Sequence, residues 1–196
     1  MKKKVGFYMG SFDPIHIGHI ATITAVLRER ILDEVLIVPA IANPAKRHEP
    51  ASLIHREAMI LRMIVQDLGD FDGMISVCHG KGEADPDGKY YSYRQLSEIL
   101  QMKPDLTETD NYIIAGTDIA PKIRKWKNSA EILAKFKVLE IVRPGYVPEK
   151  GIENGIACSS SAVREMIARG CSPIPWVPSS VWEVIKEFKL YGSGQG

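Results

Sequence analysis

Residues 5–19 read VGFYMGSFDPIHIGH, and this stretch determines the fold of the chain's beginning. Its first five residues, Val5 to Met9, form an apolar run without polar alternation, which is typical of a strand buried on both faces. A Gly-Ser-Phe-Asp-Pro turn follows, and an apolar-periodic stretch from about Ile20 to Ile31 predicts a helix. The stretch therefore predicts a strand, a loop and a helix, in that order.

The same alternation continues along the chain. Further apolar runs predict strands at 35–38, 74–78, 112–115 and 138–142. Periodic or well-capped stretches predict helices at 53–68, 93–102, 159–168 and 179–188. In the first of these helices one face carries Ile54, Ala58, Leu61 and Val65. Strands that alternate with helices in this way predict an α/β fold, a doubly wound Rossmann-like parallel sheet with helices on both faces.

This fold class indicates where function should lie. In open parallel sheets a ligand binds in the crevice beyond the carboxyl ends of the strands, so the loops after the first four strands are the ones to examine. We expect a single domain over residues 1–196, whose C-terminal two-helix portion begins at about residue 158.

Composition narrows the classes of function. The chain has 196 residues, 45% of them hydrophobic and 25% charged, and a formal net charge of +1, which argues against a broad basic face for nucleic acid. No segment approaches the ~20 apolar residues of a membrane span, so we expect no membrane partner. Cys78, Cys158 and Cys171 have neither disulfide-framework nor zinc-ligand spacing, and reduced thiols in the cytoplasm fit them best.

The loop after the first predicted strand suits an anion. His16 and His19 lie three residues apart at the expected start of a helix. A helix N-terminus presents unpaired N–H groups and about half a positive charge, and Gly18 allows the backbone to approach a ligand closely. Each imidazole can donate a hydrogen bond to a phosphoryl oxygen. The alternative interpretation is that both histidines are helix caps or half-buried residues, but the pair behind this turn favours polyphosphate binding.

A second anion site is predicted near the C-terminus. The stretch from Cys158 to Arg164 reads CSSSAVR, so serines open a helix and an arginine follows one turn inside it. A serine N-cap leaves backbone N–H groups for phosphate, and Arg164 offers a planar fork with no acid beside it in the first turn. The alternative is a simple cap with a solvent-facing arginine. Two such helix starts are what the spread charge of a nucleoside triphosphate requires.

These two stretches resemble the two signatures of the nucleotidyltransferase superfamily. Within it, the chain is similar to the nicotinate (nicotinamide) mononucleotide adenylyltransferases. The similarity extends over nearly the whole chain, because further matching segments occur in the family's order: Ala115 to Asp118, Trp126, Arg143 to Tyr146 and Val177-Pro178. The resemblance implies transfer of an adenylyl group from ATP to a pyridine mononucleotide in NAD biosynthesis, with release of pyrophosphate and with Mg²⁺ carried by ATP rather than by protein side chains.

The resemblance also implies roles for single residues on the ATP side. His16, His19 and Arg164 would be the catalytic residues, with His19 near the α-phosphate in the transition state. Ser159 and Ser160 would help Arg164 to hold the β- and γ-phosphates. The remaining ATP contacts implied by the family pattern are Gly10, Ser11, Phe12, Gly18, Lys46, Gly116 and Asp118, the last binding a ribose hydroxyl.

On the acceptor side, Trp126 is similar to the tryptophan that stacks on the pyridine ring. Tyr91-Ser92 matches a Tyr-Thr pair that meets the pyridine carboxyl or amide group, so the residues leave open which of the two groups the acceptor carries. The chain departs from the family pattern at Ala45, where a histidine is usual, and at Met9, where glycine is frequent. These departures affect the expected geometry of the triphosphate site rather than the reaction class.

Other functions remain as alternatives. A related nucleotidyltransferase with another phosphorylated acceptor, such as phosphopantetheine, would share the same motifs, and a nucleotide-binding module without turnover would share the ATP site. Aminoacylation of tRNA is disfavoured because the chain is short and lacks a Lys-Met-Ser-Lys-Ser loop. A dinucleotide-binding dehydrogenase is disfavoured because no Gly-x-Gly-x-x-Gly turn follows the first strand. The sequence leaves open whether the chain forms a homo-oligomer.

Overall fold

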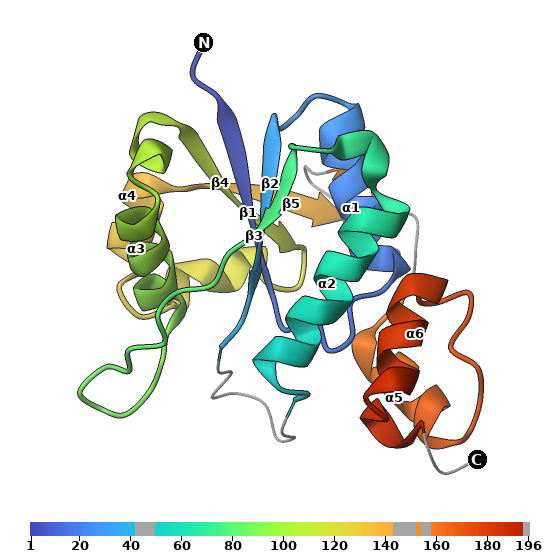
Figure 1. Cartoon of the computed structure of the whole chain (residues 1–196). Coiled ribbons are helices and arrows are strands. Elements are labelled where there is room, and N and C mark those ends of the chain that lie inside the picture. Colours follow the sequence, from blue (N-terminus) through green and yellow to red (C-terminus); the bar gives the residue numbers. More distant parts are fainter. Residues whose placement is uncertain (42–49, 143–151, 154–157, 194–196) are drawn as a thin grey trace.

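A parallel sheet forms the centre of the molecule. The computed structural model describes residues 1–41, 50–142, 152–153 and 158–193, and within these ranges six parallel strands pair in the order β3-β2-β1-β4-β5-β6 (Figure 1). The strands are β1 (Lys4–Gly10), β2 (Glu34–Pro39), β3 (Ile75–Val77), β4 (Asp110–Gly116), β5 (Lys137–Val142) and β6 (Ile152–Glu153).

Helices cover both faces of this sheet (Figure 1). On one face lie α1 (Ile17–Arg28), α2 (Leu53–Asp67), α5 (Ser160–Ala168) and α6 (Ser179–Glu187), and on the other lie α3 (Ser92–Met102) and α4 (Ser129–Lys135). Short 3-10 helices occupy Gly69–Phe71 (η1), Pro104–Glu108 (η2), Ala120–Lys125 (η3) and Leu190–Gly192 (η4).

Each face of the sheet has its own buried core, because successive strand residues point in opposite directions. Phe7, Leu36 and Ile113 are aligned across three neighbouring strands and belong to the core under α3 and α4. Val35 and Ile37 point the other way, into the core under α1, α2, α5 and α6. A sheet that is buried on both sides explains why its strands are apolar without alternation.

All five predicted strands are present, and so are the four helices predicted after the first one, with ends shifted by up to two residues. The first helix begins three residues earlier than predicted, at Ile17. The fold class is therefore confirmed. Besides the 3-10 helices, α4, of seven residues, and β6, of two, were not predicted. Neither is long enough to show a periodic pattern in sequence.

The face of α2 that the sequence analysis named is not the buried one. Ile54, Leu61 and Val65 are 71%, 52% and 76% exposed. The buried face instead carries Arg56, Met59, Ile60 and Met63. Since α2 is apolar on both sides, periodicity alone could not tell which side meets the sheet. This orientation of α2 places Arg56 inside the molecule.

The sheet order creates a crevice at one point. From β1 the chain moves outwards to β2 and β3, and then returns to β4 on the other side of β1. The connections that follow β1 and β4 therefore run in opposite directions along the sheet. The loops that leave these two strands separate and leave a crevice between them. Gly10 ends β1 and Gly116 ends β4, so two of the three predicted ATP-contacting glycines border this crevice.

Candidate active site

A cavity of about 850 Å³ opens at the carboxyl ends of β1 and β4. It collects nearly all the residues predicted to bind substrates, although they lie far apart in the sequence. The predicted residues that line it are Gly10, Ser11, Phe12, His16, His19, Tyr91, Ser92, Gly116, Asp118, Trp126, Ser159, Ser160 and Arg164. Of the others, Lys46 and the departure at Ala45 lie outside the described residues, and Gly18 is buried and does not line the cavity.

The two histidines form one unit at the start of α1. His16 is the N-cap residue, and its Nδ1 accepts a hydrogen bond from the Gly18 N–H at 3.2 Å. His19 Nδ1 accepts from the His16 N–H, also at 3.2 Å. The two rings stack with their centroids 3.8 Å apart. Both histidines therefore take part in capping this helix.

These hydrogen bonds fix where each imidazole carries its proton. A nitrogen that accepts from a backbone N–H has no proton of its own, so the neutral ring of each histidine is protonated on Nε2. His19 is also held by aromatic contacts, with ring centroids 4.9 Å from Phe12 and 5.9 Å from Tyr8. Both histidines line the cavity. The start of α1 thus places two imidazole rings of fixed orientation at the cavity, and imidazole N–H groups suit phosphoryl oxygens.

The turn before these histidines is tightly built. Phe12 has a φ of +47°, in the left-handed region that side chains rarely adopt, yet its ring is buried. A Cβ atom on Gly10 would lie 3.0 Å from Cζ of that ring. Glycine at position 10 therefore lets the Phe12 ring fold back under the loop and support His19. Met9, where the family pattern frequently has glycine, also lines the cavity.

Helix α5 closes the phosphate side of the cavity. Ser159 caps it, with its Oγ accepting from the Ala162 N–H at 3.2 Å, and no acidic residue lies in its first turn. The Ser160 hydroxyl donates to the Pro14 carbonyl oxygen at 3.0 Å, and Arg164 Nη1 donates to the Asp13 carbonyl oxygen at 2.6 Å. The helix therefore holds the loop after β1 in place and brings the two predicted anion sites into one cavity.

Arg164 meets an acid that the sequence analysis did not identify. The Asp13 carboxylate lies 3.5 Å from Arg164 Nη1 and is completely buried. Its Oδ1 accepts from the Ala51 N–H at 3.0 Å and from the Tyr191 hydroxyl at 2.7 Å. The negative charge of Asp13 thus helps to orient the guanidinium of Arg164, which also donates from Nη2 to the Ser161 hydroxyl at 3.2 Å, and Arg164 lines the cavity.

Two further side chains complete this buried group. Arg56, on the inner face of α2, donates from Nη1 to the Ser11 carbonyl oxygen at 2.9 Å and from Nε to the Ala51 carbonyl oxygen at 2.8 Å. Burial lowers the pKa of Arg56 and raises that of Tyr191, whose neighbour Asp13 raises it further. Tyr191 therefore stays protonated and remains a donor to Asp13 throughout the physiological pH range.

Replacing Tyr191 with phenylalanine tests this connection. The variant removes a donor from a buried carboxylate, so we expect the free energy of unfolding to fall by about 1–3 kcal/mol. Urea denaturation measures it. Tyr112→Phe is the matched control, because Tyr112 lies in β4 beside Lys137 and away from Asp13, and its effect should stay within about 0.5 kcal/mol. Equal losses in the two variants would contradict the proposed importance of the Tyr191–Asp13 contact.

The acceptor side of the cavity comes from two other segments. Tyr91 is the N-cap residue of α3 and Ser92 is the first residue of that helix, while Trp126 directly follows η3. All three are half-buried and line the cavity. The fold therefore brings together the residues predicted for the acceptor, opposite those predicted for the triphosphate.

Several residues at the site could not be recognised in the sequence. Asp13 stands inside the first motif, but nothing in the sequence links it to Tyr191, 178 positions away. Lys127, beside Trp126, lines the cavity and forms ion pairs with Asp85 at 2.8 Å and Asp87 at 3.6 Å. These contacts join loops that are distant in sequence, and no local pattern indicates them.

No helix in the described part of the chain is long and apolar enough to span a membrane.

Comparison with known proteins is consistent with this geometry. A family model described as cytidylyltransferase-like matches residues 7–166. Similar curated proteins are the probable nicotinate-nucleotide adenylyltransferases of Lactococcus lactis, 30% identical over 97% of this chain and 96% of the relative, and of Oceanobacillus iheyensis, 29% identical over 98% and 99%. A similar solved structure is nicotinic acid mononucleotide adenylyltransferase from Plasmodium falciparum complexed with NaAD, with a TM-score of 0.79 and 17% identity over 99% of this chain and 100% of that one.

Proposed function

Because the chain belongs to the cytidylyltransferase-like family, and within it to the nicotinate-nucleotide adenylyltransferases, we propose that it joins ATP and nicotinate mononucleotide. The products are nicotinate adenine dinucleotide and pyrophosphate, and the reaction belongs to NAD biosynthesis. The observation that carries this proposal is the pair of oriented histidines in one cavity with Arg164 and, on the other side, with Tyr91, Ser92 and Trp126.

The reaction is a direct displacement at phosphorus. An oxygen of the acceptor's phosphate attacks the α-phosphorus of ATP and forms a new P–O bond. The bond from the α-phosphorus to the bridging oxygen of the β-phosphate breaks, and its electron pair leaves with pyrophosphate. The attacking oxygen is already ionised, so no protein base is needed, and the protein's contribution is positioning and stabilisation of charge.

The residues on the phosphate side supply this stabilisation. The Nε2–H groups of His16 and His19 donate to phosphoryl oxygens, and His19 stands at the α-phosphate, where negative charge shifts during the displacement. Arg164, held by Asp13, neutralises the β- and γ-phosphates that become the leaving group. Ser159 and Ser160 at the start of α5 offer backbone N–H groups to the same phosphates.

The remaining cavity residues divide between adenosine and the acceptor. Gly116, which ends β4, and Asp118, which follows it, take the adenosine, with the Asp118 carboxylate on a ribose hydroxyl. Gly10, Ser11 and Phe12 form the floor under the triphosphate, and Lys46 remains a proposed phosphate ligand. Trp126 stacks on the pyridine ring, while Ser92 and Tyr91 meet its carboxylate.

Mg²⁺ is the proposed cofactor and arrives bound to ATP. The phosphate side of the cavity is lined by imidazole and guanidinium groups and serine hydroxyls, which suit phosphate oxygens better than a cation that prefers oxygen ligands and water. When bound, the ion neutralises charge on the triphosphate. We also propose a cytoplasmic location, which the three free cysteines support.

The direct test is pyrophosphate release from ATP and Mg²⁺, with nicotinate mononucleotide and nicotinamide mononucleotide offered separately and the product identified by mass. We expect the nicotinate compound to react about tenfold faster or more, the equivalent of one charge-assisted hydrogen bond. A His19→Ala preparation controls for contaminating enzymes. Release with neither compound, together with tight ATP binding, would instead favour a nucleotide-binding module, and release only with phosphopantetheine would favour another acceptor.

A further inference from the structure

Asp85 is a buried carboxylate behind the acceptor side of the cavity. It belongs to the segment of residues 78–91 that connects β3 to α3, and only 4% of Asp85 is exposed. Among the described residues, the cavity is lined by Tyr91, Ser92 and Trp126 but not by Asp85 itself. An almost fully buried carboxylate is costly unless it is paired, so its partners show what it holds together.

Those partners come from two separate elements. The Tyr93 hydroxyl lies 2.6 Å from both carboxylate oxygens, and Arg94 donates to Oδ1 from Nε at 3.0 Å and from Nη2 at 2.7 Å, all from the first turn of α3. Lys127 Nζ donates to Oδ2 at 2.8 Å from the segment after η3. These contacts, that of Lys127 foremost, hold the pKa of Asp85 far below its ordinary range.

The partners are the sequence neighbours of the acceptor-binding residues. Tyr93 and Arg94 directly follow Ser92, and Lys127 directly follows Trp126. One carboxylate thus ties the wall that carries Ser92 to the wall that carries Trp126. We propose that Asp85 is a positioning residue that sets the spacing between these two walls, and through it the affinity for the pyridine mononucleotide. This inference rests on the proposed function.

Two other acids, Glu98 and Asp87, also bond to this region, but neither bonds as closely to the wall that carries Trp126. Glu98 anchors the rest of the segment to α3, because its Oε2 accepts from the Tyr90 hydroxyl at 2.7 Å and from the Lys81 N–H at 2.6 Å. Asp87, which is more exposed, accepts from the Tyr91 hydroxyl at 2.7 Å but lies 3.6 Å from Lys127. Of these three acids, Asp85 has the shortest link to the wall that carries Trp126.

The decisive variant is Asp85→Asn, which keeps the shape of the side chain and removes its charge. We expect the KM for nicotinate mononucleotide to rise about tenfold, because small displacements of binding groups weaken ground-state and transition-state contacts together. The KM for ATP should change less than about twofold. Steady-state kinetics with each substrate varied in turn measures both constants.

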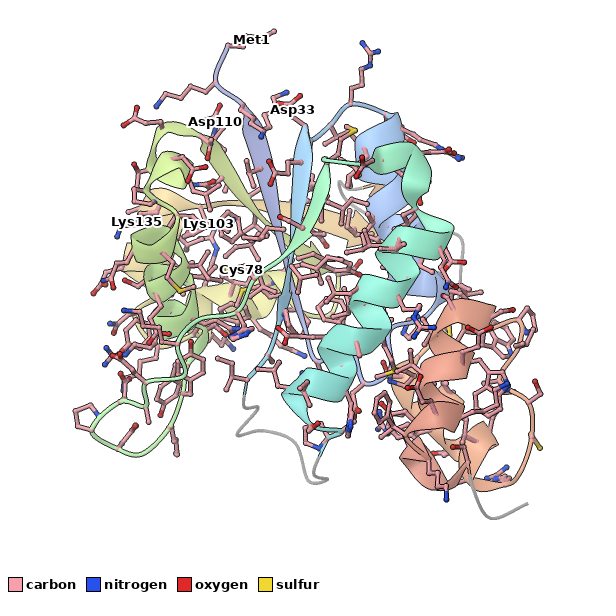
Figure 2. The ribbon with its side chains drawn as sticks, viewed as in Figure 1. Met1, Asp33, Cys78, Lys103, Asp110 and Lys135 are labelled. Atoms are coloured by element: carbon pink, nitrogen blue, oxygen red, sulfur yellow. The ribbon has the colours of Figure 1, made fainter. Side chains whose placement is uncertain are left out.

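A matched control is Asp110→Asn. Asp110 also pairs with a lysine, Lys137, at 3.3 Å. It lies at the beginning of β4, at the end of the strands away from the cavity, near Asp33 and the N-terminus (Figure 2). The same chemical change there should leave both KM values unaltered.

A double-mutant cycle separates positioning from direct contact. Lys127→Met removes the ammonium group that bridges to Asp85, and if the two residues act through each other, the double variant is no worse than Asp85→Asn alone. Amide hydrogen exchange without any substrate gives an independent readout. In Asp85→Asn we expect faster exchange in residues 79–94 and 117–128, and unchanged exchange in residues 4–28.

The possible outcomes separate cleanly. Equal rises in both KM values would reduce Asp85 to a general structural role and overturn the proposal. A lower acceptor KM would show that removing a negative charge near an anionic substrate outweighs positioning, and unaltered hydrogen exchange would show that the walls are not tied; each result also overturns it. If the wild-type protein forms no dinucleotide, the proposed function has failed and the acceptor role of Asp85 fails with it, while the exchange experiment still reports whether the tie exists.

Discussion

Replacing His19 with alanine is expected to reduce turnover by about two to three orders of magnitude, the usual effect of removing one transition-state donor. The Nδ1 of this ring is occupied by the His16 N–H, so the lost group is the Nε2–H donor at the α-phosphate. Because that hydrogen bond strengthens only as charge shifts in the transition state, kcat should fall and the KM for ATP should change little. Pyrophosphate release at saturating substrates measures the effect.

Two further variants sharpen this experiment. His19→Asn keeps an acceptor for the His16 N–H while removing the distal donor, so it should lose as much activity as alanine if the donor is what matters. His55→Ala, on the exposed N-terminal turn of α2, removes a histidine outside the cavity and should be close to wild type. A drop of less than threefold in His19→Ala, with the fold intact, would refute the assigned role.

Replacing Arg164 with methionine is the second large effect that we expect. The kcat/KM for ATP should fall about 100-fold, because two charge-assisted hydrogen bonds to phosphate are lost. Each such bond contributes about 1.5–3 kcal/mol. The KM for the acceptor should stay within about threefold, because Arg164 stands on the opposite side of the cavity. Initial rates with each substrate varied in turn distinguish the two constants.

Arg164→Lys and Arg62→Met serve as comparisons. Lysine keeps the charge but cannot bond Asp13 and phosphate through a planar fork, so it should recover only part of the loss. Arg62 forms ion pairs with Glu183 and Glu187 on the outside of α6, and its loss should not affect kinetics. If Arg164→Met weakens both substrates equally, then Arg164 organises the whole cavity rather than holding the leaving group.

Much of the fold could be predicted because it is encoded locally. The central strands β1, β2 and β4 are apolar runs over most of their length, and α2 and α5 begin at serine N-caps, Ser52 and Ser159. The side of α2 that is buried could not be predicted, because Ile54 and Ile60 are equally apolar and only the position of the sheet and of α6 decides between them. Such choices depend on tertiary packing, which a periodic pattern does not contain.

The candidate site divides in the same way. The histidine pair and the serine–arginine stretch follow helix-start rules that can be read along the chain, and both prove to border one cavity. The groups that hold them do not follow such rules: Asp13 meets Tyr191, and Asp85 meets Lys127. A carboxylate that bonds a residue tens or hundreds of positions away has no local signature. The sequence therefore identified most of the polar residues assigned to substrates but not the groups that support them.

The sheet topology described above has a consequence for how such proteins diversify. In the proposed assignment the triphosphate lies between the loop after β1 and α5, whereas the acceptor lies against Tyr91, Ser92 and Trp126, which come between these two elements in the chain. Changes at Tyr91, Ser92 and Trp126 can therefore alter which small molecule is adenylylated while the histidine pair and Arg164 are left undisturbed. The proposed adenosine residues, Gly116 and Asp118, lie between these positions, so an exchange of acceptor would act in two short segments on either side of them.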